Sequence, residues 1–357
     1  MDAIGRGVDD ELGGEDRIAM EENEFNPSEA YIVYASDDGF AEILGVSLVS
    51  LYKNSQDMDA IHVYILDSGI SPLNRSRIEE VARQYHEPMP VWIEARDISK
   101  EVGMSVAMDR GSLSQYARLF VSSDLPDELE RVIYLDCDII IAQSISELWN
   151  LDMHGKTMAA LNDAFSRYYR KNIDLEPEDI MFNSGVMLIN LNRWREREVE
   201  KSLLKFISDH KGKIQQGDQG ALNAVLSHDV YCFHPRFNSV TIFYDFTYHE
   251  LYVYRKPAGK YYTEAEIKEA TEHPVIIHFT TSFLSRRPWV KDCHHRYCEL
   301  WRSYKAESPW RDEPLREDTR PAWKLRGIRI FKKLPRGLAM HIAGFLQAYG
   351  RPIKNKW

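Results

Sequence analysis

Two aspartates interrupt a stretch of sequence that otherwise has the character of a buried strand. In RVIYLDCDIII, residues 131–141, only Cys137 separates Asp136 from Asp138. Carboxylates two positions apart just past a strand can bind one ion, and oxygen ligands are those that Mg²⁺ and Mn²⁺ prefer. Such an ion can neutralise a diphosphate leaving group. The other interpretation is a polar turn that ends the strand, because Asp-x-Asp alone is a common pattern.

The elements that precede this pair alternate between strand and helix. Apolar runs at 31–35, 61–67 and 91–95 predict strands. Helical spacing predicts helices over 72–85 and 112–121. This alternation indicates an α/β fold with a mostly parallel sheet, in which ligands bind at the carboxyl ends of the strands.

Acidic residues follow several of these strands. Asp37, Asp67, Asp97 and Asp136 each come shortly after a predicted strand. The carboxyl ends of parallel strands lie on the same edge of a sheet, so we expect an acidic rim that would favour a cation.

The second half of the chain is less regular. Strands are predicted at 182–191 and 274–279. We expect a long charged helix over 192–210, a short helix over 216–226 and a final helix over 287–304.

Composition limits the classes of protein to which the chain can belong. The chain has 357 residues and a formal net charge of −10, which argues against a nucleic-acid partner. Residues 1–28 are acidic, glycine-rich and poor in apolar positions, so we expect them to be disordered. Four cysteines in a chain of this length do not make a disulfide framework, and the acidic start does not resemble a signal peptide. We therefore expect a reducing, cytoplasmic location.

The carboxyl-terminal region has the opposite charge. Residues 319–357 contain ten Lys and Arg and no acidic residue, and Trp323, Phe331 and Trp357 are interleaved with the cations. This pattern predicts a basic tail that binds the anionic inner leaflet of a membrane. A solvated tail, or one folded back on the acidic start, is the alternative.

Further motifs give the aspartate pair a context. QYARL precedes YLDCDIII, and FNSGVMLINL, GDQGALN and HF…RRPW follow it. In this order, over roughly residues 31–305, the chain resembles the family 8 glycosyltransferases, especially the bacterial lipopolysaccharide and lipooligosaccharide galactosyl- and glucosyltransferases. The resemblance implies a GT-A fold, a Rossmann-like mostly parallel sheet flanked by helices, over residues 29–310. Residues 311–357 would form the basic, membrane-associating region.

The resemblance also implies an activity. Such a hexosyltransferase would move glucose or galactose from a UDP-sugar, with Mn²⁺ (or Mg²⁺) as the cofactor and with retention at the anomeric carbon. The acceptor would be a lipid-linked, cell-envelope glycan of the lipopolysaccharide type, and the enzyme would be peripheral at the inner face of the cell membrane. The alternatives are a protein or other glycan acceptor, and a non-catalytic relative that only binds UDP-sugar.

Motif by motif, the resemblance implies roles for particular residues. The metal ligands would be Asp136, Asp138 and His278. The nucleotide would contact these three residues together with Ala35, Ser36, Asp37, Phe40, Cys137 and Arg287. In RRPW, Arg287 takes the place of the family's lysine and can bind phosphate through two hydrogen bonds.

The donor sugar has its own set of residues by the same resemblance. Its hydroxyls would contact Arg118, Asp163 (or Asn162 under a one-residue shift), Asn183, Asp218 and Gln219. Asp218 and Gln219 would lie closest to the chemistry. The acid that the family has at the third position of this motif is replaced by Gly220.

Two other chemistries fit the sequence less well. CHHRYC, residues 293–298, lacks the paired Cys-x₂-Cys spacing of a structural zinc site. A sugar nucleotidyltransferase would need a glycine-rich basic loop after the first strand, where this chain has the acidic ASDDGF.

Overall fold

The computed structural model describes residues 26–107 and 114–354. The first 25 residues of the predicted acidic segment and Trp357 lie outside this part of the chain. The strands are β1 (Glu29–Ser36), β2 (Ala60–Asp67), β3 (Val91–Glu94), β4 (Arg131–Leu135), β5 (Ile139–Ile141), β6 (Met158–Asn162), β7 (Phe182–Asn190), β8 (Val230–Cys232), β9 (Ser239–Val240) and β10 (Ile276–His278).

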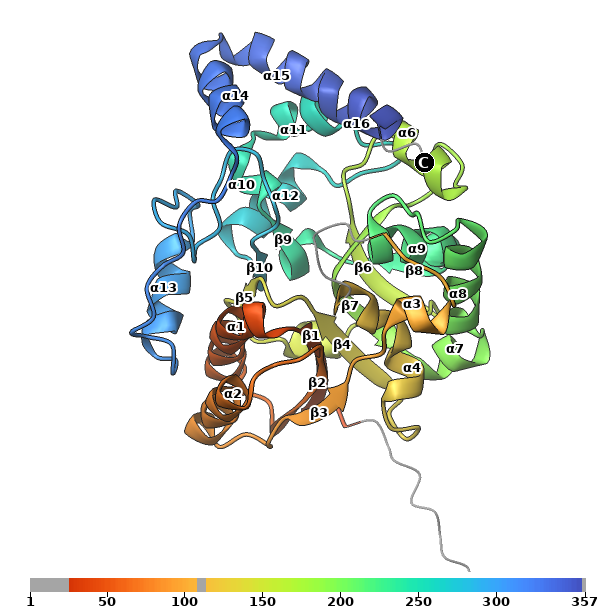
Figure 1. Ribbon diagram of the computed structural model, residues 1–357, viewed down its shortest axis with the longest axis vertical. Helices are drawn as coiled ribbons and strands as arrows, with labels where there is room; N and C mark the ends of the chain where they lie inside the picture. Colours follow the sequence, from red (N-terminus) through yellow and green to blue (C-terminus); the bar gives the residue numbers. More distant parts are fainter. Residues whose placement is uncertain (1–25, 108–113, 355–357) are drawn as a thin grey trace, which may run out of the picture.

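The helices alternate with these strands in the first half and dominate the second half (Figure 1). The α-helices are α1 (Ala41–Asn54), α2 (Pro72–Tyr85), α3 (Ile98–Glu101), α4 (Val121–Asp124), α5 (Ser146–Trp149), α6 (Arg167–Arg170), α7 (Leu191–Glu196), α8 (Val199–Asp209), α9 (Gly217–Leu226), α10 (Ile242–Asp245), α11 (Tyr248–Arg255), α12 (Glu264–Glu272), α13 (Cys298–Ala306), α14 (Ala322–Lys333), α15 (Arg336–Phe345) and α16 (Arg351–Lys354). The 3₁₀ turns are η1 (Asp38–Phe40), η2 (Ser114–Phe120), η3 (Lys171–Ile173), η4 (Ser227–Asp229) and η5 (Pro235–Asn238), and a π turn covers Leu346–Gly350.

The large sheet has seven strands in the order β3-β2-β1-β4-β7-β6-β8. β1 pairs in parallel with β2 and β4, β2 with β3, and β6 with β8, whereas β7 runs antiparallel to both of its neighbours. This arrangement confirms the predicted, mostly parallel α/β sheet flanked by helices.

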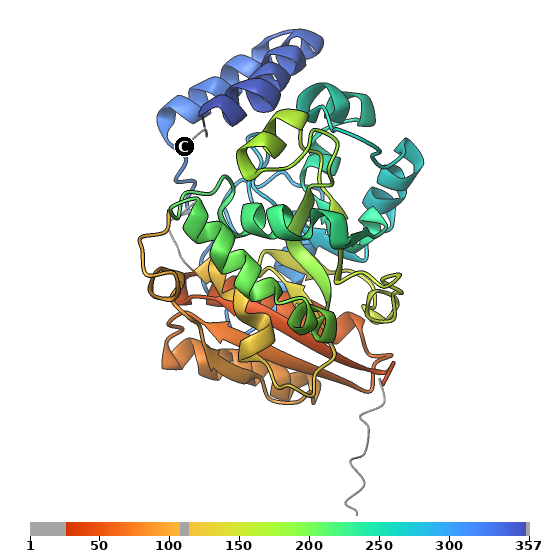
Figure 2. The ribbon, with the colours of Figure 1, turned by 90° about the vertical axis from the view of Figure 1, so that its right-hand side faces the viewer.

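Each face of the sheet has its own apolar core. Along β1, Ile32 and Tyr34 belong to the core that includes α1, whereas Val33 belongs to the core that includes α7, α8 and α9. Figures 1 and 2 show these helices on opposite sides of the sheet. Burial on both faces explains why the strands are almost continuously apolar.

A second sheet explains the interruption between residues 135 and 139. β5 leaves the large sheet and pairs antiparallel with β10, which pairs in parallel with β9. Asp136 and Asp138 therefore lie at the junction of the two sheets, where the chain passes from one to the other.

Three predicted helices differ from the observed ones. From Ser114, the segment predicted as the helix 112–121 is the 3₁₀ turn η2, in which five consecutive side chains are buried, so packing on all sides replaces a single apolar stripe. The predicted helix 192–210 breaks at Glu198, whose φ of 48° lies in the left-handed region. The break lets Trp194 in α7 and the stripe that begins at Val199 in α8 both reach the core.

The third predicted helix, 287–304, begins only at Cys298. Asp292 has a φ of 53°, which ends any helical course before it, and a disulfide ties Cys293 to Cys298. The helix α13 therefore starts at the second cysteine of the bridge.

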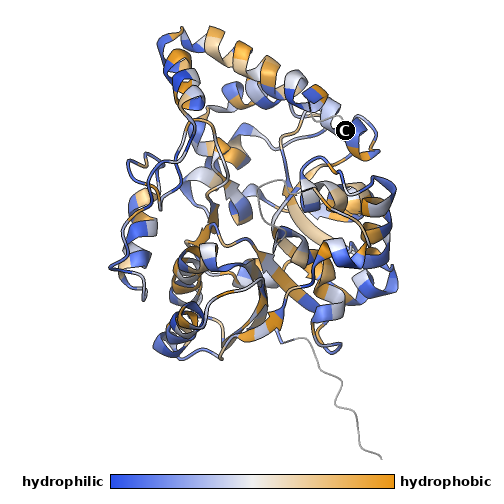
Figure 3. Cartoon of the chain, viewed as in Figure 1, coloured by the Kyte–Doolittle hydropathy of each residue, from blue (hydrophilic) through white to orange (hydrophobic). Residues whose placement is uncertain are grey.

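The carboxyl-terminal helices pack on the body of the protein. Ala339, Met340 and Gly344 of α15 are buried, and a Cβ on Gly344 would lie 2.3 Å from the Val253 carbonyl oxygen of α11. Figure 1 shows α14 to α16 lying across one end of the molecule, and Figure 3 shows hydrophobic residues recurring along α15. Within residues 26–107 and 114–354, none of the helices combines enough length with enough apolar character to span a bilayer.

Candidate active site

The structure brings together the three residues predicted to bind the metal. Asp136, Asp138 and His278 each offer one ligand atom, and these atoms all lie within 4.8 Å of one another. His278 Nε2 is 3.2 Å from Asp138 Oδ1 and 3.7 Å from Asp136 Oδ2. The pairing of β10 with β5 places His278 beside this loop, because His278 is in register with Ile139.

Hydrogen bonds determine which nitrogen of His278 faces the carboxylates. The backbone N–H of Gly185 donates to Asn183 Oδ1, so the Asn238 amide nitrogen must be the group that donates to the same oxygen, at 2.9 Å. Asn238 Oδ1 then accepts from His278 Nδ1–H at 3.0 Å. With Nδ1 turned toward Asn238, Nε2 is the nitrogen of His278 that faces Asp138 and is placed to act as a ligand atom.

A divalent cation can bind where an imidazole nitrogen and carboxylate oxygens converge. Nε2 of His278 and the oxygens of Asp136 and Asp138 form such a set, and a mixed nitrogen and carboxylate set suits Mn²⁺. The hydrogen bond from His278 Nδ1–H to Asn238 Oδ1 fixes the orientation of the ring, as the second ring nitrogen of metal-binding histidines commonly does. The residues present therefore fit a divalent cation.

Sequence reasoning missed two residues that shape this cluster. A Cβ on Gly185 would lie 2.2 Å from His278 Cε1 and 2.8 Å from Asp136 Oδ2, so only glycine fits beside them. Asn238 orients the imidazole, as described above. A glycine inside a strand pattern indicates close approach of another group, so FNSGVMLINL held a signal for Gly185, whereas Asn238 lies in no recognised motif.

Arg118 joins the two acidic parts of the site. Its guanidinium donates to Asp136 Oδ1 at 2.7 Å, and its Nε lies 3.1 Å from Asp218 Oδ2. Burial would lower the pKa of Arg118, but Asp136 and Asp218 outweigh burial and raise it. The arginine thus remains a cation inside the protein and fixes both carboxylates.

The residues predicted to contact the donor sugar are linked to this network. Asp163 is buried, and its carboxylate is hydrogen-bonded by the Asn183 side chain. Burial raises the pKa of Asp163, while Arg255 and Asn183 oppose the rise. Gln219 Oε1 accepts from the Ser184 backbone N–H at 3.3 Å.

Two positions of the predicted donor-sugar motifs have distinct surroundings in the structure. Asn162 is engaged elsewhere, since its side chain donates to the Lys260 carbonyl, so it is Asp163 that lies next to Asn183. A Cβ on Gly220 would lie 2.0 Å from the Gln215 carbonyl oxygen. The acid that the family has at this position would not fit here.

The first strand ends in the turn predicted to hold the nucleotide. Ala35 accepts from the Cys137 thiol at 3.3 Å, so the β1 turn lies against the aspartate loop. Burial raises the pKa of Cys137, which keeps the thiol protonated and unsuited to bind a metal. Ser36 is buried, Asp37 precedes η1, and Phe40 is partly buried against the core.

Arg287 lies at the opposite edge of the metal cluster. Its guanidinium is 3.0 Å from Asp138 Oδ2 and donates to Thr281 Oγ1 at 2.9 Å. The same side chain lies over the Trp289 ring, 5.3 Å from its centroid. A phosphate group at the cluster would thus meet a cation that is already in place.

The acidic rim predicted from the strand ends is only partly assembled. Asp67 accepts from the backbone N–H groups of Gly69 and Ile70 and pairs with Arg75. Asp97 caps α3 by accepting from Ser99. These two acids stabilise their own loops, because β2 and β3 lie progressively farther from β4 in the sheet.

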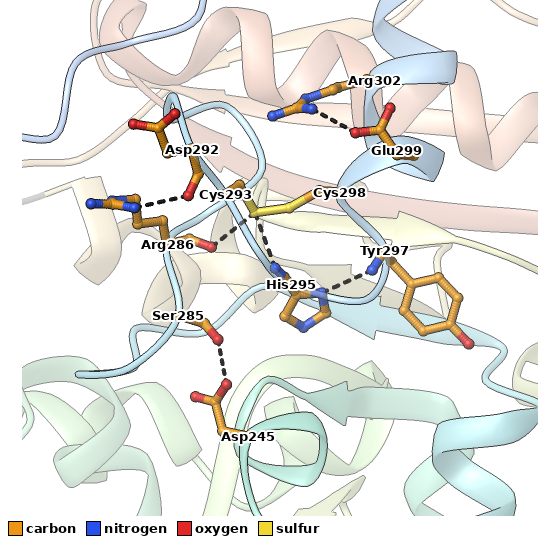
Figure 4. The surroundings of a disulfide bond; sticks show 10 residues. All are labelled: Asp245, Ser285, Arg286, Asp292, Cys293, His295, Tyr297, Cys298, Glu299 and Arg302. Carbon is orange, nitrogen blue, oxygen red and sulfur yellow. Dashed lines mark hydrogen bonds and ion pairs between the residues drawn. A yellow bond between two sulfur atoms is a disulfide. The ribbon is translucent and has the colours of Figure 1, made fainter. Parts of the chain in front are cut away.

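CHHRYC forms a closed loop beside Arg286 (Figure 4). A disulfide joins Cys293 to Cys298, and Cys293 Sγ lies 3.2 Å from the Arg286 carbonyl oxygen. The sequence did not predict this bond, since the short spacing alone does not distinguish free thiols from a bridge. With both sulfurs bonded to each other, neither is available as a zinc thiolate.

The fold is that of a glycosyltransferase. Residues 31–293 match the family described as Glycosyl transferase family 8, and the chain belongs to this family. General stress protein A of Bacillus subtilis is 29% identical over 78% of this chain and 94% of its own length. Lipopolysaccharide 1,2-glucosyltransferase of Escherichia coli is 22% identical over 80% of each chain.

A solved structure supports the same conclusion. The galactosyltransferase LgtC, in complex with donor and acceptor sugar analogs, matches with a TM-score of 0.65 and 25% identity over 84% of this chain and 99% of its own. The predicted family and the predicted GT-A fold are therefore confirmed.

Proposed function

We propose that this protein is a retaining, Mn²⁺-dependent hexosyltransferase that moves glucose or galactose from a UDP-sugar to a cell-envelope glycan. The observation that carries the proposal is the convergence of His278 Nε2, Asp138 Oδ1 and Asp136 Oδ2, one ligand atom from each residue. One imidazole nitrogen and two carboxylates form a ligand set that a divalent cation such as Mn²⁺ can bind.

Asp136, Asp138 and His278 would hold the cation. When bound, a divalent cation offsets the negative charge of a diphosphate leaving group. Arg287 would add a second positive charge to the same diphosphate, through a guanidinium that already lies next to Asp138. Together these groups favour departure of UDP.

Ala35, Ser36, Asp37 and Phe40 would bind uracil and ribose. An acid such as Asp37 can accept from a base N–H or a hydroxyl, and an aromatic such as Phe40 can cover a base face. The contact of Cys137 with the Ala35 carbonyl supports this assignment, because it fixes the nucleotide turn relative to the aspartate loop.

Arg118, Asp163, Asn183, Asp218 and Gln219 would bind the hydroxyls of the sugar. An amide is a poor nucleophile, so we favour attack by the acceptor hydroxyl on the face that UDP leaves, with a phosphate oxygen taking its proton. The bond from the anomeric carbon to the acceptor oxygen forms as the bond to the UDP oxygen breaks. The side chain of Gln219 would orient the sugar.

The acceptor would be lipid-linked and reached from the inner face of the cell membrane. Trp323 and Ile330 of α14 and Phe345 of α15 are more than half exposed, next to a run of cations. Apolar and basic groups on one surface favour an anionic membrane.

The test is a panel of UDP-sugars with the purified chain. We expect UDP release from UDP-glucose or UDP-galactose with Mn²⁺, loss of release with EDTA, and recovery with added Mn²⁺. No UDP from any UDP-hexose, despite a thermal shift on adding UDP and Mn²⁺, would instead identify a non-catalytic binding relative. Release that is unaffected by EDTA would contradict metal dependence.

A further inference from the structure

Asn172 lies between the carboxyl-terminal helices and the segment that precedes α9. It is part of η3, and its Nδ2 donates to the Pro352 carbonyl at 2.9 Å and to Gln215 Oε1 at 2.5 Å. Pro352 of α16 is buried, and Gln215 is only 3% exposed. One amide nitrogen therefore joins the last helix to the segment that leads to Asp218 and Gln219.

The backbone after Gln215 is unusual. Gln216 and Gly217 have φ values of 68° and 58°, so two successive residues are left-handed before α9 begins. The left-handed conformation raises the conformational free energy of a residue with a side chain, here Gln216, by about 1–2 kcal/mol, and contacts with the surroundings must offset this cost. The Gln215 carbonyl also lies where a Cβ of Gly220 would be, so the first turn of α9 packs directly on Gln215.

Gln219 depends on this turn. Its Nε2 donates to Gln216 Oε1 at 3.4 Å, and its Oε1 accepts from the Ser184 N–H. A displacement of Gln215 would therefore move Gln216, and with it one of the two partners that orient the Gln219 amide.

The tail makes further bonds to the same region. Ser166 Oγ donates to the Ala348 carbonyl at 2.7 Å, and Tyr169 Oη donates to the Gln347 carbonyl at 3.0 Å. Both donors lie in or next to α6, just before Asn172. The close approach of Gly344 to Val253 holds the preceding helix, α15, on α11.

From these contacts we infer that α15 and α16 are a structural support of the sugar-transfer site, acting through Asn172. Asn172 is a positioning residue that fixes Gln215, and thereby orients Gln219 toward the sugar. The inference rests on the proposed function for the role of Gln219. It goes beyond membrane binding, because the same helices would be required for transfer to an acceptor that is free in solution.

Two substitutions break the connection at different points. Asn172→Asp keeps the shape of the side chain, but its carboxylate cannot donate to the two oxygens. Gly344→Ala places a methyl group against the Val253 carbonyl and displaces α15. For both variants we expect kcat for UDP release from UDP-glucose or UDP-galactose, with Mn²⁺ and with water as the acceptor, to fall on the order of 10- to 100-fold, as expected when a reacting group is misplaced. The Kd for UDP with Mn²⁺ should stay unchanged.

Matched controls separate this effect from general damage. Gly337→Ala lies on the same helix, where an added Cβ would meet nothing within 4 Å, and Lys171→Ala changes the exposed neighbour of Asn172. We expect both controls to keep the wild-type kcat. In the double variant Asn172→Asp/Gly344→Ala, the loss should not exceed that of the stronger single variant, because both changes act on one connection.

Hydrogen exchange gives a readout that needs no activity. Asn172→Asp and Gly344→Ala should increase amide exchange in residues 214–219, and the controls should not. If the wild-type chain transfers no sugar, the proposed function fails, and the exchange result still decides whether the tail holds this turn. Unchanged exchange and unchanged kcat in Asn172→Asp, or losses that multiply in the double variant, would overturn the inference.

Discussion

Charged groups have different surroundings in the metal cluster and in α14. In the cluster, Asp136 and Asp138 lie against Arg118, Arg287 and His278. Five cations of α14 form no ion pair with another residue in the described part of the chain: Lys324, Arg326, Arg329, Lys332 and Lys333.

The difference shows what each set of charges is able to do. Charges held by buried partners lose their freedom to move, and the fixed geometry suits the binding of one ion. Charges left in solvent keep their hydration and can bind an external anionic surface. This difference supports the two proposals, that the cluster binds a cation and that α14 contacts an anionic membrane surface.

The largest expected effect is at the buried carboxylates. Asp138→Asn removes a negative ligand, and we expect turnover to fall by about 100-fold or more, since the cation supplies several kcal/mol of stabilisation. Asp67→Asn is the matched control at another strand end. It should retain turnover and lower the free energy of unfolding by about 1–3 kcal/mol, because it removes the negative charge that pairs with Arg75 and strengthens the hydrogen bonds from two backbone N–H groups. Turnover assays and urea unfolding of both variants check this pair. Loss of turnover in Asp67→Asn would contradict the comparison and would support the prediction that Asp67 belongs to the acidic rim of the site.

The buried imidazole of His295 makes the stability of the protein depend on pH. It lies between the rings of Tyr244 and Phe279, and burial lowers its pKa to about 4. The unfolded chain takes up this proton near pH 6.5, before the folded chain does. Stability is therefore full above pH 6.5 and is lost as the pH falls to about 4, by up to about 3 kcal/mol. Urea unfolding at pH 7.5 and 4.5 should show a smaller pH dependence for His295→Phe, and an equal dependence would refute the assignment.

A smaller effect is expected on α14. Lys332→Gln/Lys333→Gln should weaken binding to vesicles that contain anionic lipid by about 2 kcal/mol, at about 1 kcal/mol for each cation. Turnover on a soluble acceptor should stay at the wild-type level. Lys201→Gln/Lys205→Gln, on the exposed face of α8, is the charge-matched control. Equal vesicle binding by both double variants would contradict the comparison between α14 and the rest of the surface.

Much of the site could be predicted because its residues lie in short motifs at strand ends. Asp136 and Asp138 follow a strand that is recognisable from its apolar run, and His278 ends another. Gly185 and Asn238 act only through contacts between distant segments, which one sequence does not reveal. Such partners become visible once β7, η5 and β10 are placed together.

The mistaken predictions have a similar cause. Asp67 has the same local pattern as Asp136, but its position in the sheet gives it backbone partners instead of a metal site. The helix predicted over 192–210 has a suitable pattern throughout, yet packing of Trp194 and Val199 breaks it. Local sequence indicates the type of element, whereas the sheet order decides which residues meet.

The most direct measurement is calorimetric titration of Mn²⁺ into the chain saturated with UDP. One equivalent should bind to the wild-type protein, and binding should be lost in Asp138→Asn while the variant remains folded. The same stoichiometry and affinity in both proteins would contradict a cation held by Asp136, Asp138 and His278.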